Sequence, residues 1–243
     1  DEINFQGSGT ISAFIMEPIL GAGGVIPPHA SFMPAVREVC DRHGILLIAD
    51  EVITGFGRTG SWSGSRLWGV QPDIMCIAKA ITSGYFPLGA ALINERIATA
   101  FESDSSGKAA IGHGYTYSGH PVGAAAALAA IAETKRLDVV ANAAARGTQL
   151  YDGMVSLAGH YPVVGDVRGG HGLMTAMELV ADLETKAPID GKLAIKMQKA
   201  AYQAGALIRV SGPNVILSPS LVIEKADIDT ALNAVEEGLK AIS

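Results

Sequence analysis

Short runs of apolar residues, each closed by a charged or glycine-rich stretch, predict buried strands in the first third of the chain. These runs are residues 11–16, 45–49 and 74–78. The runs 45–49 and 74–78 are unbroken, which is typical of parallel strands that are buried on both faces of a sheet. The spacing of Phe32, Val36 and Cys40 predicts a helix between the first two runs, and Gly44 ends that helix. The alternation of strands and helices indicates an α/β fold.

The clearest predicted helix covers residues 121–137, because alanines fill it without an internal breaker. Its apolar stretch at 124–132 predicts that this helix is buried. Beyond about residue 142 the connections between predicted elements become longer. The predicted strands there are 163–167, 173–180, 207–210 and 215–217, and the predicted helices are 191–204 and 225–241. We therefore expect two domains, residues 1–142 and a smaller α+β domain of residues 143–243.

Composition and charge exclude several classes of protein. The 18 Lys and Arg residues are outnumbered by 24 Asp and Glu residues, and the formal net charge of −6 argues against a nucleic-acid surface. The longest apolar run without glycine, 124–132, is far shorter than the roughly 20 residues of a membrane span. The two cysteines, Cys40 and Cys76, provide neither a disulfide framework nor a metal-ligand spacing. Because no metal-ligand spacing is present, the chain is expected to bind no metal. Because its start has no signal-peptide pattern, the chain is expected to be cytoplasmic.

Two residues at predicted strand ends carry the candidate chemistry. Asp50 directly follows the second apolar run, and Lys79 directly follows the third. Ligands of open α/β sheets bind at the carboxyl ends of strands, and a lysine there is costly to bury unless it is used. Lysine amines form Schiff bases with carbonyl cofactors, and a carboxylate can hold a pyridinium nitrogen protonated. The pair therefore predicts a pyridoxal phosphate site.

The segments around Asp50 and Lys79 resemble the class III pyridoxal-phosphate aminotransferases of fold type I. The motifs that carry the resemblance lie at residues 14–18, 48–52, 72–73, 78–79, 83–85, 113–121 and 167–174. The resemblance spans nearly the whole chain. It implies the C-terminal half of the large domain, with a mixed, mostly parallel sheet and flanking helices, plus a small α+β C-terminal domain. No Gly-Ser/Thr-rich phosphate turn precedes Glu17, so we expect the N-terminal half of that large domain to be missing from this sequence.

The resemblance also implies a role for each site residue. Lys79 is the Schiff-base lysine and proton shuttle, and Asp50 pairs with the pyridine nitrogen. Val52 packs on one face of the ring, and Glu17 orients the polar network beside Asp50. Thr116 matches the residue that binds the cofactor phosphate of the neighbouring subunit. A homodimer with shared active sites is therefore expected.

Three positions bear on the amino acceptor. Family members that use 2-oxoglutarate carry a glutamate and an arginine where this sequence has Ala22 and Ile216. Arg209 instead matches the mobile arginine of amine:pyruvate ω-transaminases, which binds a substrate carboxylate. We therefore expect transamination of a primary amine or ω-amino acid, with pyruvate as the acceptor.

Other interpretations stay open at this point. An aminomutase, epimerase or decarboxylase of the same fold shares the ring-binding residues, and a non-catalytic dimerising remnant is the alternative if half of the cofactor domain is absent. Thr116 is also suited to a turn hydroxyl, and Arg209 to a surface or interface salt bridge. Glu51 is predicted to be a structural hydrogen-bonding partner, and Arg168 to hold the loop that opens the small domain.

Overall fold

The structure, a computed structural model, describes all residues 1–243 and divides them into two compact units. The first unit comprises Asp1–Pro18, Pro28–Phe56 and Ser63–Arg136. The second unit comprises Ile19–Pro27, Gly57–Trp62 and Leu137–Ser243. Two short segments from the first third of the chain therefore belong to the second unit. The domain assignment to residues 1–142 and 143–243 stays a prediction.

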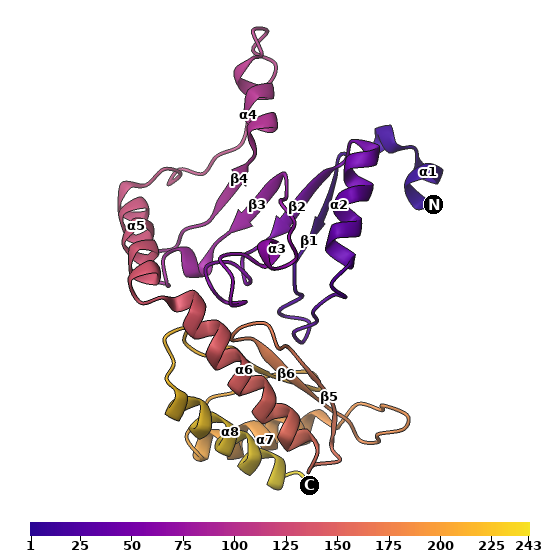
Figure 1. The fold of residues 1–243 in the computed structure, drawn as a ribbon, viewed down its shortest axis with the longest axis vertical. Coiled ribbons are helices and arrows are strands. Elements are labelled where there is room, and N and C mark those ends of the chain that lie inside the picture. The colour runs from indigo at the N-terminus through magenta and orange to yellow at the C-terminus, as the bar shows by residue number, and fades with distance from the viewer. The chain divides into compact units, whose positions relative to one another are not determined.

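A four-stranded mixed sheet forms the centre of the first unit (Figure 1). Its strands, in spatial order, are β1 (Ala13–Met16), β2 (Leu46–Asp50), β3 (Ile74–Ile77) and β4 (Ala90–Ile93). The first three strands are parallel and correspond to the three predicted runs, whereas β4 is antiparallel and was not predicted. The expectation of strands buried on both faces was wrong. In β2 fully buried residues alternate with half-buried ones, and in β1 Phe14 and Ile15 are exposed.

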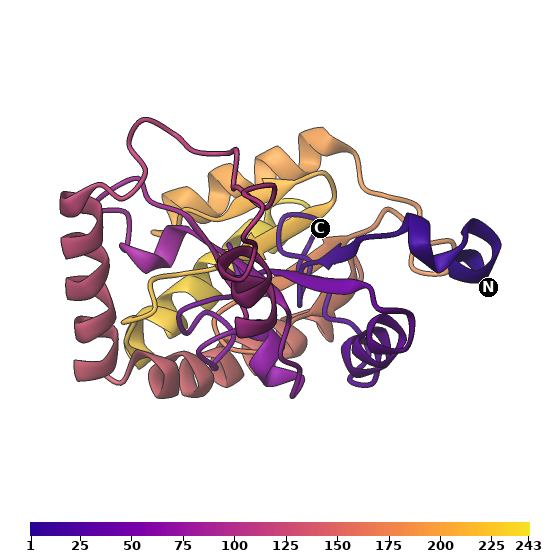
Figure 2. The ribbon, with the colours of Figure 1, turned by 90° about the horizontal axis from the view of Figure 1, so that it is seen from above.

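Helices accompany this sheet in the first unit, and several of the connections between elements are long. They are α1 (Glu2–Gln6), α2 (Phe32–His43), α3 (Gly64–Leu67), α4 (Glu95–Glu102) and α5 (Pro121–Arg136), with 3₁₀ turns η1 (Ser8–Thr10) and η2 (Lys79–Ile81). Helix α2 lies beside β1 and β2 (Figure 2) and packs Met33 and Cys40 into a core with Leu47 of β2. As predicted, Gly44 ends this helix, in the left-handed conformation with φ 70°.

The prediction that the alanine-rich helix is buried was wrong. In α5 only Gly123 and Ala127 are buried, and Leu128 is 71% exposed. Ala127 contacts a small core with Ile77 and Ile81, while most of the remaining alanines of the helix are exposed. A methyl group offers little apolar area, so an alanine run is stabilised by helix propensity without needing burial on every side.

The second unit is an antiparallel sheet with helices on one face. Its strands, in spatial order, are β5 (Val164–Arg168), β6 (Thr175–Leu179), β8 (Asn214–Leu217) and β7 (Arg209–Ser211). Its helices are α6 (Val139–Ala158), α7 (Gly191–Gln203) and α8 (Lys225–Lys240). Met177 and Val215 from the sheet share one core with Leu150, Met197 and Val235 from the three helices. None of the helices in either unit has the length and apolar character needed to cross a membrane.

The segment Gly57–Trp62 joins the second unit through Arg58. The guanidinium of Arg58 donates to the carbonyl oxygens of Leu173 and Pro219, at 2.8 and 2.7 Å. Burial lowers the pKa of Arg58 to about 10. At Gly172 an added Cβ would lie 2.3 Å from the carbonyl oxygen of Arg58, so only glycine allows this close approach.

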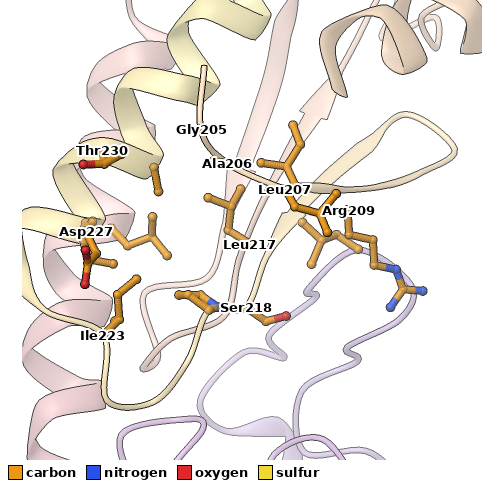
Figure 3. Close-up of a pocket in the computed structure, with 15 residues that line it drawn as sticks. Gly205, Ala206, Leu207, Arg209, Leu217, Ser218, Ile223, Asp227 and Thr230 are labelled. Atoms are coloured by element: carbon orange, nitrogen blue, oxygen red, sulfur yellow. The ribbon is translucent and has the colours of Figure 1, made fainter. Parts of the chain in front are cut away.

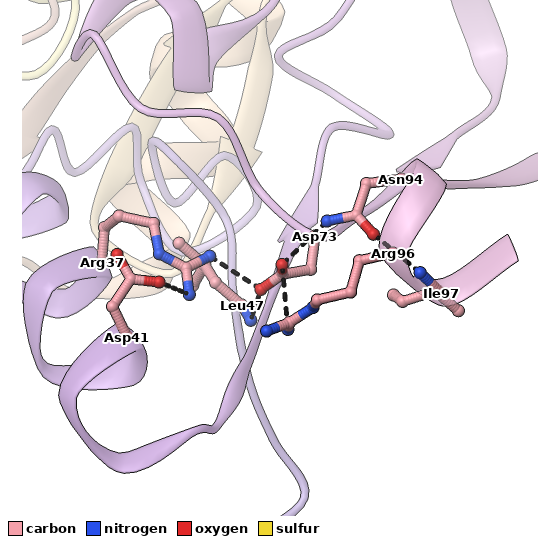
Figure 4. Close-up of polar contacts among 7 residues, drawn as sticks. All are labelled: Arg37, Asp41, Leu47, Asp73, Asn94, Arg96 and Ile97. Carbon is pink, nitrogen blue, oxygen red and sulfur yellow. Dashed lines mark hydrogen bonds and ion pairs between the residues drawn. The ribbon is translucent and has the colours of Figure 1, made fainter. Parts of the chain in front are cut away.

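A buried carboxylate holds together the end of the first sheet where β3 begins (Figure 4). Asp73 accepts hydrogen bonds from the backbone N–H of Leu47 and from Nη1 of Arg37, both at 2.8 Å, and from Nδ2 of Asn94 at 2.9 Å. Arg96 adds an ion pair at 3.3 Å. Burial opposes ionisation, but the hydrogen bonds from Leu47 and Arg37 and the two arginine charges outweigh it and lower the pKa of Asp73. The cluster lies at the end of β3 opposite to Lys79, so its role is structural.

Replacing Asp73 with alanine is expected to lower the free energy of unfolding by about 3 kcal/mol, because two arginines and a backbone N–H lose their shared acceptor. Since folding lowers the pKa of Asp73, its contribution is complete above the usual aspartate pKa and is lost as the pH falls through the folded-state value. Denaturation followed by circular dichroism at pH 7 and at pH 3 measures both effects. The matched control is Glu133→Ala, which removes an exposed partner of Arg136. Equal losses in the two variants would refute the structural role.

Candidate functional site

The carboxyl ends of three neighbouring parallel strands carry the predicted site residues of the first unit. Glu17 directly follows β1, Asp50 is the last residue of β2, and Lys79 comes two residues after β3. The register sets Met16 beside Ala49, and Asp50 beside Cys76 of β3. Because adjacent strands are about 4.8 Å apart, the three residues lie along one edge of the sheet. This is the edge at which open α/β sheets bind ligands.

Lys79 combines a free side chain with a constrained backbone. Its side chain is exposed, and its amine has no hydrogen-bond or ion-pair partner in the first unit. Its φ of 48° lies in the left-handed region that non-glycine residues rarely adopt. The flanking residues Ile77 and Ile81 are both buried, at 7% exposure, and hold this backbone in place. Strained backbone of this kind clusters at functional sites, and it had no signature in the sequence.

Asp50 presents one carboxylate oxygen that is free to accept a further hydrogen bond. Its Oδ1 accepts from the backbone N–H of Val52 at 3.0 Å, and no donor in the first unit contacts Oδ2. Burial, together with the negative charge of Asp50, raises the pKa of the Cys76 thiol on the neighbouring strand. Val52 itself is half-buried. A half-buried carboxylate with an open oxygen is suited to accept from a protonated ring nitrogen.

Glu51 fixes the backbone that presents Asp50. Its side chain is fully buried, and its carboxylate accepts from the N–H groups of Gly64 and Ser65, both at 2.7 Å, and from Oγ1 of Thr54 at 2.5 Å. At Gly64 an added Cβ would lie 2.7 Å from Pro18, so a side chain would not fit there. As predicted, Glu51 is a structural hydrogen-bonding partner.

Thr116 lies in an exposed turn before α5. Its hydroxyl has no partner in the first unit, and the neighbouring Tyr115 and Tyr117 are 75% and 77% exposed. The turn itself is ordered, because the N–H of Tyr115 donates to Oγ of Ser118 at 3.0 Å. The structure therefore leaves the hydroxyl of Thr116 available to a ligand.

Arg209 belongs to the second unit, at the start of β7. It is exposed and lies directly opposite Ile216 of β8 in the antiparallel register. Arg209 also lines a cavity of about 350 Å³ between β8 and α8, but its guanidinium extends away from the other lining residues (Figure 3). The lining is mostly apolar and consists of residues of the second unit alone, so the cavity contains neither Lys79 nor Asp50.

The residues at the sheet edge fit a pyridoxal phosphate cofactor in two respects. Lys79 offers an unpaired amine for an aldehyde, and Asp50 offers an open carboxylate oxygen for a pyridine nitrogen. Val52 supplies an apolar surface beside Asp50 for a ring. For the phosphate, Thr116 supplies one available hydroxyl. No group of three or more His, Cys, Asp or Glu side chains in the structure could hold a metal ion.

Comparison with known families identifies the class of protein. The sequence model of the family described as Aminotransferase class-III matches residues 2–239. The chain therefore belongs to the class III aminotransferases, a family of pyridoxal-phosphate-dependent enzymes. The resemblance stated from the sequence motifs is confirmed, as is the α/β fold corresponding to part of a fold type I domain.

Individual relatives support the same assignment. An amine transaminase from an uncultivated Pseudomonas species, solved with bound pyridoxal phosphate, is 49% identical over the whole chain with a TM-score of 0.96, and 55% of its own chain is covered. Putrescine–pyruvate aminotransferase of Pseudomonas aeruginosa is 40% identical over 92% of this chain and 48% of its own length. Diaminobutyrate–2-oxoglutarate transaminase of Halomonas elongata is 37% identical over 98% of this chain and 51% of its own length. The chain thus spans about half the length of the curated relatives it matches.

Proposed function

We propose that the protein catalyses pyridoxal-phosphate-dependent transamination of a primary amine or ω-amino acid, with pyruvate as the amino acceptor. One observation carries the proposal. An unpaired lysine amine on a strained backbone and a carboxylate with an open oxygen lie at the carboxyl ends of adjacent parallel strands. When bound, pyridoxal phosphate supplies an aldehyde and a protonated ring that withdraws electrons from the substrate carbon.

Each residue of this edge has a separate task in the proposal. The amine of Lys79 would hold the cofactor through its aldehyde carbon, and once released it would act as the base that moves the proton of the substrate carbon. The carboxylate of Asp50 keeps the ring nitrogen protonated, and Val52 packs against one face of the ring. Glu17, half-buried at the end of β1, orients the polar groups beside Asp50.

Thr116 supports a homodimer in which the two subunits share their sites. Its hydroxyl lacks a partner in its own unit, and it is flanked by two tyrosines that are more than 70% exposed. Large aromatic side chains at this exposure are enriched where a second protein surface covers them. In the proposed dimer Thr116 binds the phosphate of the cofactor held by the neighbouring subunit.

The choice between pyruvate and 2-oxoglutarate as the amino acceptor depends on which side chains can bind the carboxylates of the oxo acid. Ala22 and Ile216 provide no partner for the second carboxylate of 2-oxoglutarate, whereas Arg209 provides one guanidinium directly opposite Ile216. One bidentate arginine suits the single carboxylate of pyruvate. The names of the relatives include both a pyruvate and a 2-oxoglutarate enzyme, so relatedness alone does not choose between these acceptors.

Steady-state kinetics with the two oxo acids test the acceptor. We expect kcat/KM to be higher for pyruvate, and Arg209→Ala to lower it about 10- to 100-fold by removing a charge-assisted pair. Turnover of an apolar amine is expected to change much less. Arg146→Ala is the matched control, because Arg146 contacts only Gln149 on its own helix. A preference for 2-oxoglutarate would refute the acceptor proposal, and equal losses for all substrates would make Arg209 a structural residue. Racemisation or decarboxylation without amino transfer would favour the other reactions of this fold.

A further inference from the structure

The short helix α3 packs against the chain just beyond two neighbouring strands of the first unit. Its first residue, Gly64, is buried, and an added Cβ there would lie 2.7 Å from Cβ of Pro18 and 2.9 Å from Cβ of Thr54. Pro18 lies two residues after β1, and Thr54 lies four residues after β2. Because a side chain at Gly64 would not fit, α3 approaches the ends of both strands as closely as the backbone allows.

Glu51 ties α3 to the end of β2. Its buried carboxylate accepts hydrogen bonds from the first two N–H groups of α3 and from the hydroxyl of Thr54. Its own N–H donates to the carbonyl oxygen of Cys76 at 2.9 Å, which continues the pairing of β2 with β3. Glu51 therefore joins α3 to both of these strands directly beside Asp50.

Trp68, the residue that follows α3, ties the helix to the end of β1. Its indole Nε1 donates to the carbonyl oxygen of Pro18 at 2.9 Å, and Pro18 is buried. Trp68 is half-buried and packs against the core that contains Leu47 of β2, so this donor is held in place by packing as well. The chain leaves the first unit after Pro18. The bond from Trp68 therefore fixes the chain at the point where it departs from β1.

These two ties act on residues that share one face of the sheet. The register sets Met16 beside Ala49, and both contact the core that α2 covers. Successive side chains of a strand point to opposite faces, so the next residues, Glu17 and Asp50, face away from that core. Because Glu17 directly precedes Pro18, a shift of Pro18 against α3 changes the distance between the carboxylates of Glu17 and Asp50.

We propose that Trp68 is a positioning residue for the cofactor site. By holding the carbonyl of Pro18, it keeps Glu17 in register with Asp50, whose carboxylate accepts from the ring nitrogen of pyridoxal phosphate in the proposed function. A site whose polar groups are ordered before binding loses less conformational freedom when its ligand binds. The role of Trp68 rests on the proposed function, because it requires that the cofactor binds at this edge of the sheet.

Trp68→Phe removes the donor to Pro18 and keeps an aromatic ring against the core. Titration of the purified protein with pyridoxal phosphate, followed by the absorbance of the bound cofactor, measures the dissociation constant. We expect this constant to rise about fivefold, which is the effect of one lost hydrogen bond. Tyr161→Phe is the matched control, because it removes an aromatic donor to Glu236 in the second unit, at 3.1 Å, and should leave the constant unchanged.

A double-mutant cycle with Glu17→Gln separates positioning from structural support. Glu17→Gln alone is expected to raise the dissociation constant about tenfold, because a charged acceptor is lost. If Trp68 acts through Glu17, adding Trp68→Phe to Glu17→Gln weakens binding no further. Gly64→Ala, whose added Cβ displaces Pro18 from α3, takes the place of Trp68→Phe in the cycle if that variant fails to fold.

The outcomes of the titration distinguish the role of Trp68 from the proposed function. Additive effects of Trp68→Phe and Glu17→Gln overturn the positioning role, and so does an unchanged dissociation constant in either single variant. A wild-type protein that binds no pyridoxal phosphate overturns the positioning role and the proposed function together. A wild-type protein that binds the cofactor but transfers no amino group refutes the proposed function alone, and the cycle then still decides the role of Trp68.

Discussion

Replacing Lys79 with alanine is expected to lower transaminase turnover by about 10³-fold or more, because the amine that holds the cofactor and the base that moves the proton are lost together. The structure gives no other lysine a comparable place, since Lys79 follows β3 at the edge where the parallel strands end. Steady-state turnover of an amine with pyruvate measures the loss. Lys108→Ala, at an exposed position in the same unit, is the matched control and should leave turnover unchanged.

The free energy of unfolding of the Lys79 variants shows whether a loss of activity reflects a lost reacting group or a lost fold. Lys79 has a φ of 48°, and alanine at that position keeps the backbone strain, whereas glycine relieves it. We therefore expect Lys79→Gly to be about 1 kcal/mol more stable than Lys79→Ala while being equally inactive. Denaturant unfolding measures the difference. An active glycine variant would show that Lys79 is not the reacting amine.

Replacing Asp50 with asparagine is expected to lower kcat/KM by roughly 10²–10³-fold, which is the size of effect that a preorganised electrostatic contact has on catalysis. An amide does not hold a ring nitrogen protonated, so the cofactor becomes a weaker electron acceptor. The oxygen of asparagine still accepts from the N–H of Val52, as Asp50 does at 3.0 Å, so the local backbone is retained. Asp152→Asn, an exposed carboxylate of α6, is the control.

Alkylation of Cys76 in Asp50→Asn measures the loss of the Asp50 charge independently of catalysis. The charge of Asp50 contributes to the raised pKa of Cys76, so Asp50→Asn should lower that pKa and speed alkylation of Cys76 at a fixed pH. Cys40 is buried in a separate core and serves as the internal reference. Unchanged turnover together with faster alkylation would show that the carboxylate is near Cys76 but has no role in the reaction.

The strands that end in site residues could be predicted because their signal is local. Apolar runs bounded by charge located β2 and β3 to within one residue at each end, and their parallel pairing brought Asp50 and Lys79 to one edge. The left-handed backbone of Lys79 was not predictable, because burial of Ile77 and Ile81 on either side imposes it against local preference.

The sequence did not predict the elements that depend on contacts between residues far apart in the chain. Helix α6 contains glycines that favour a break, yet Gly147 is required there because an added Cβ would lie 2.1 Å from the carbonyl oxygen of Gly172. The hairpin Ile19–Pro27 belongs to the second unit through the bond from Arg168 to Gly24, which joins residues far apart in the sequence. The sequence predicted that Arg168 holds the loop that opens the small domain, whereas its backbone bond is to Gly24 in the hairpin Ile19–Pro27. No local sequence pattern predicts a contact between residues as far apart in the chain as Gly24 and Arg168.

Reductive trapping tests most directly whether Lys79 holds the cofactor. The purified protein is saturated with pyridoxal phosphate, treated with borohydride, digested and mapped by mass spectrometry. We predict that the reduced cofactor is found on the peptide containing Lys79, and that Lys79→Ala loses this label. Absence of label from the wild-type protein, or its random spread over exposed lysines such as Lys108, would contradict the assignment.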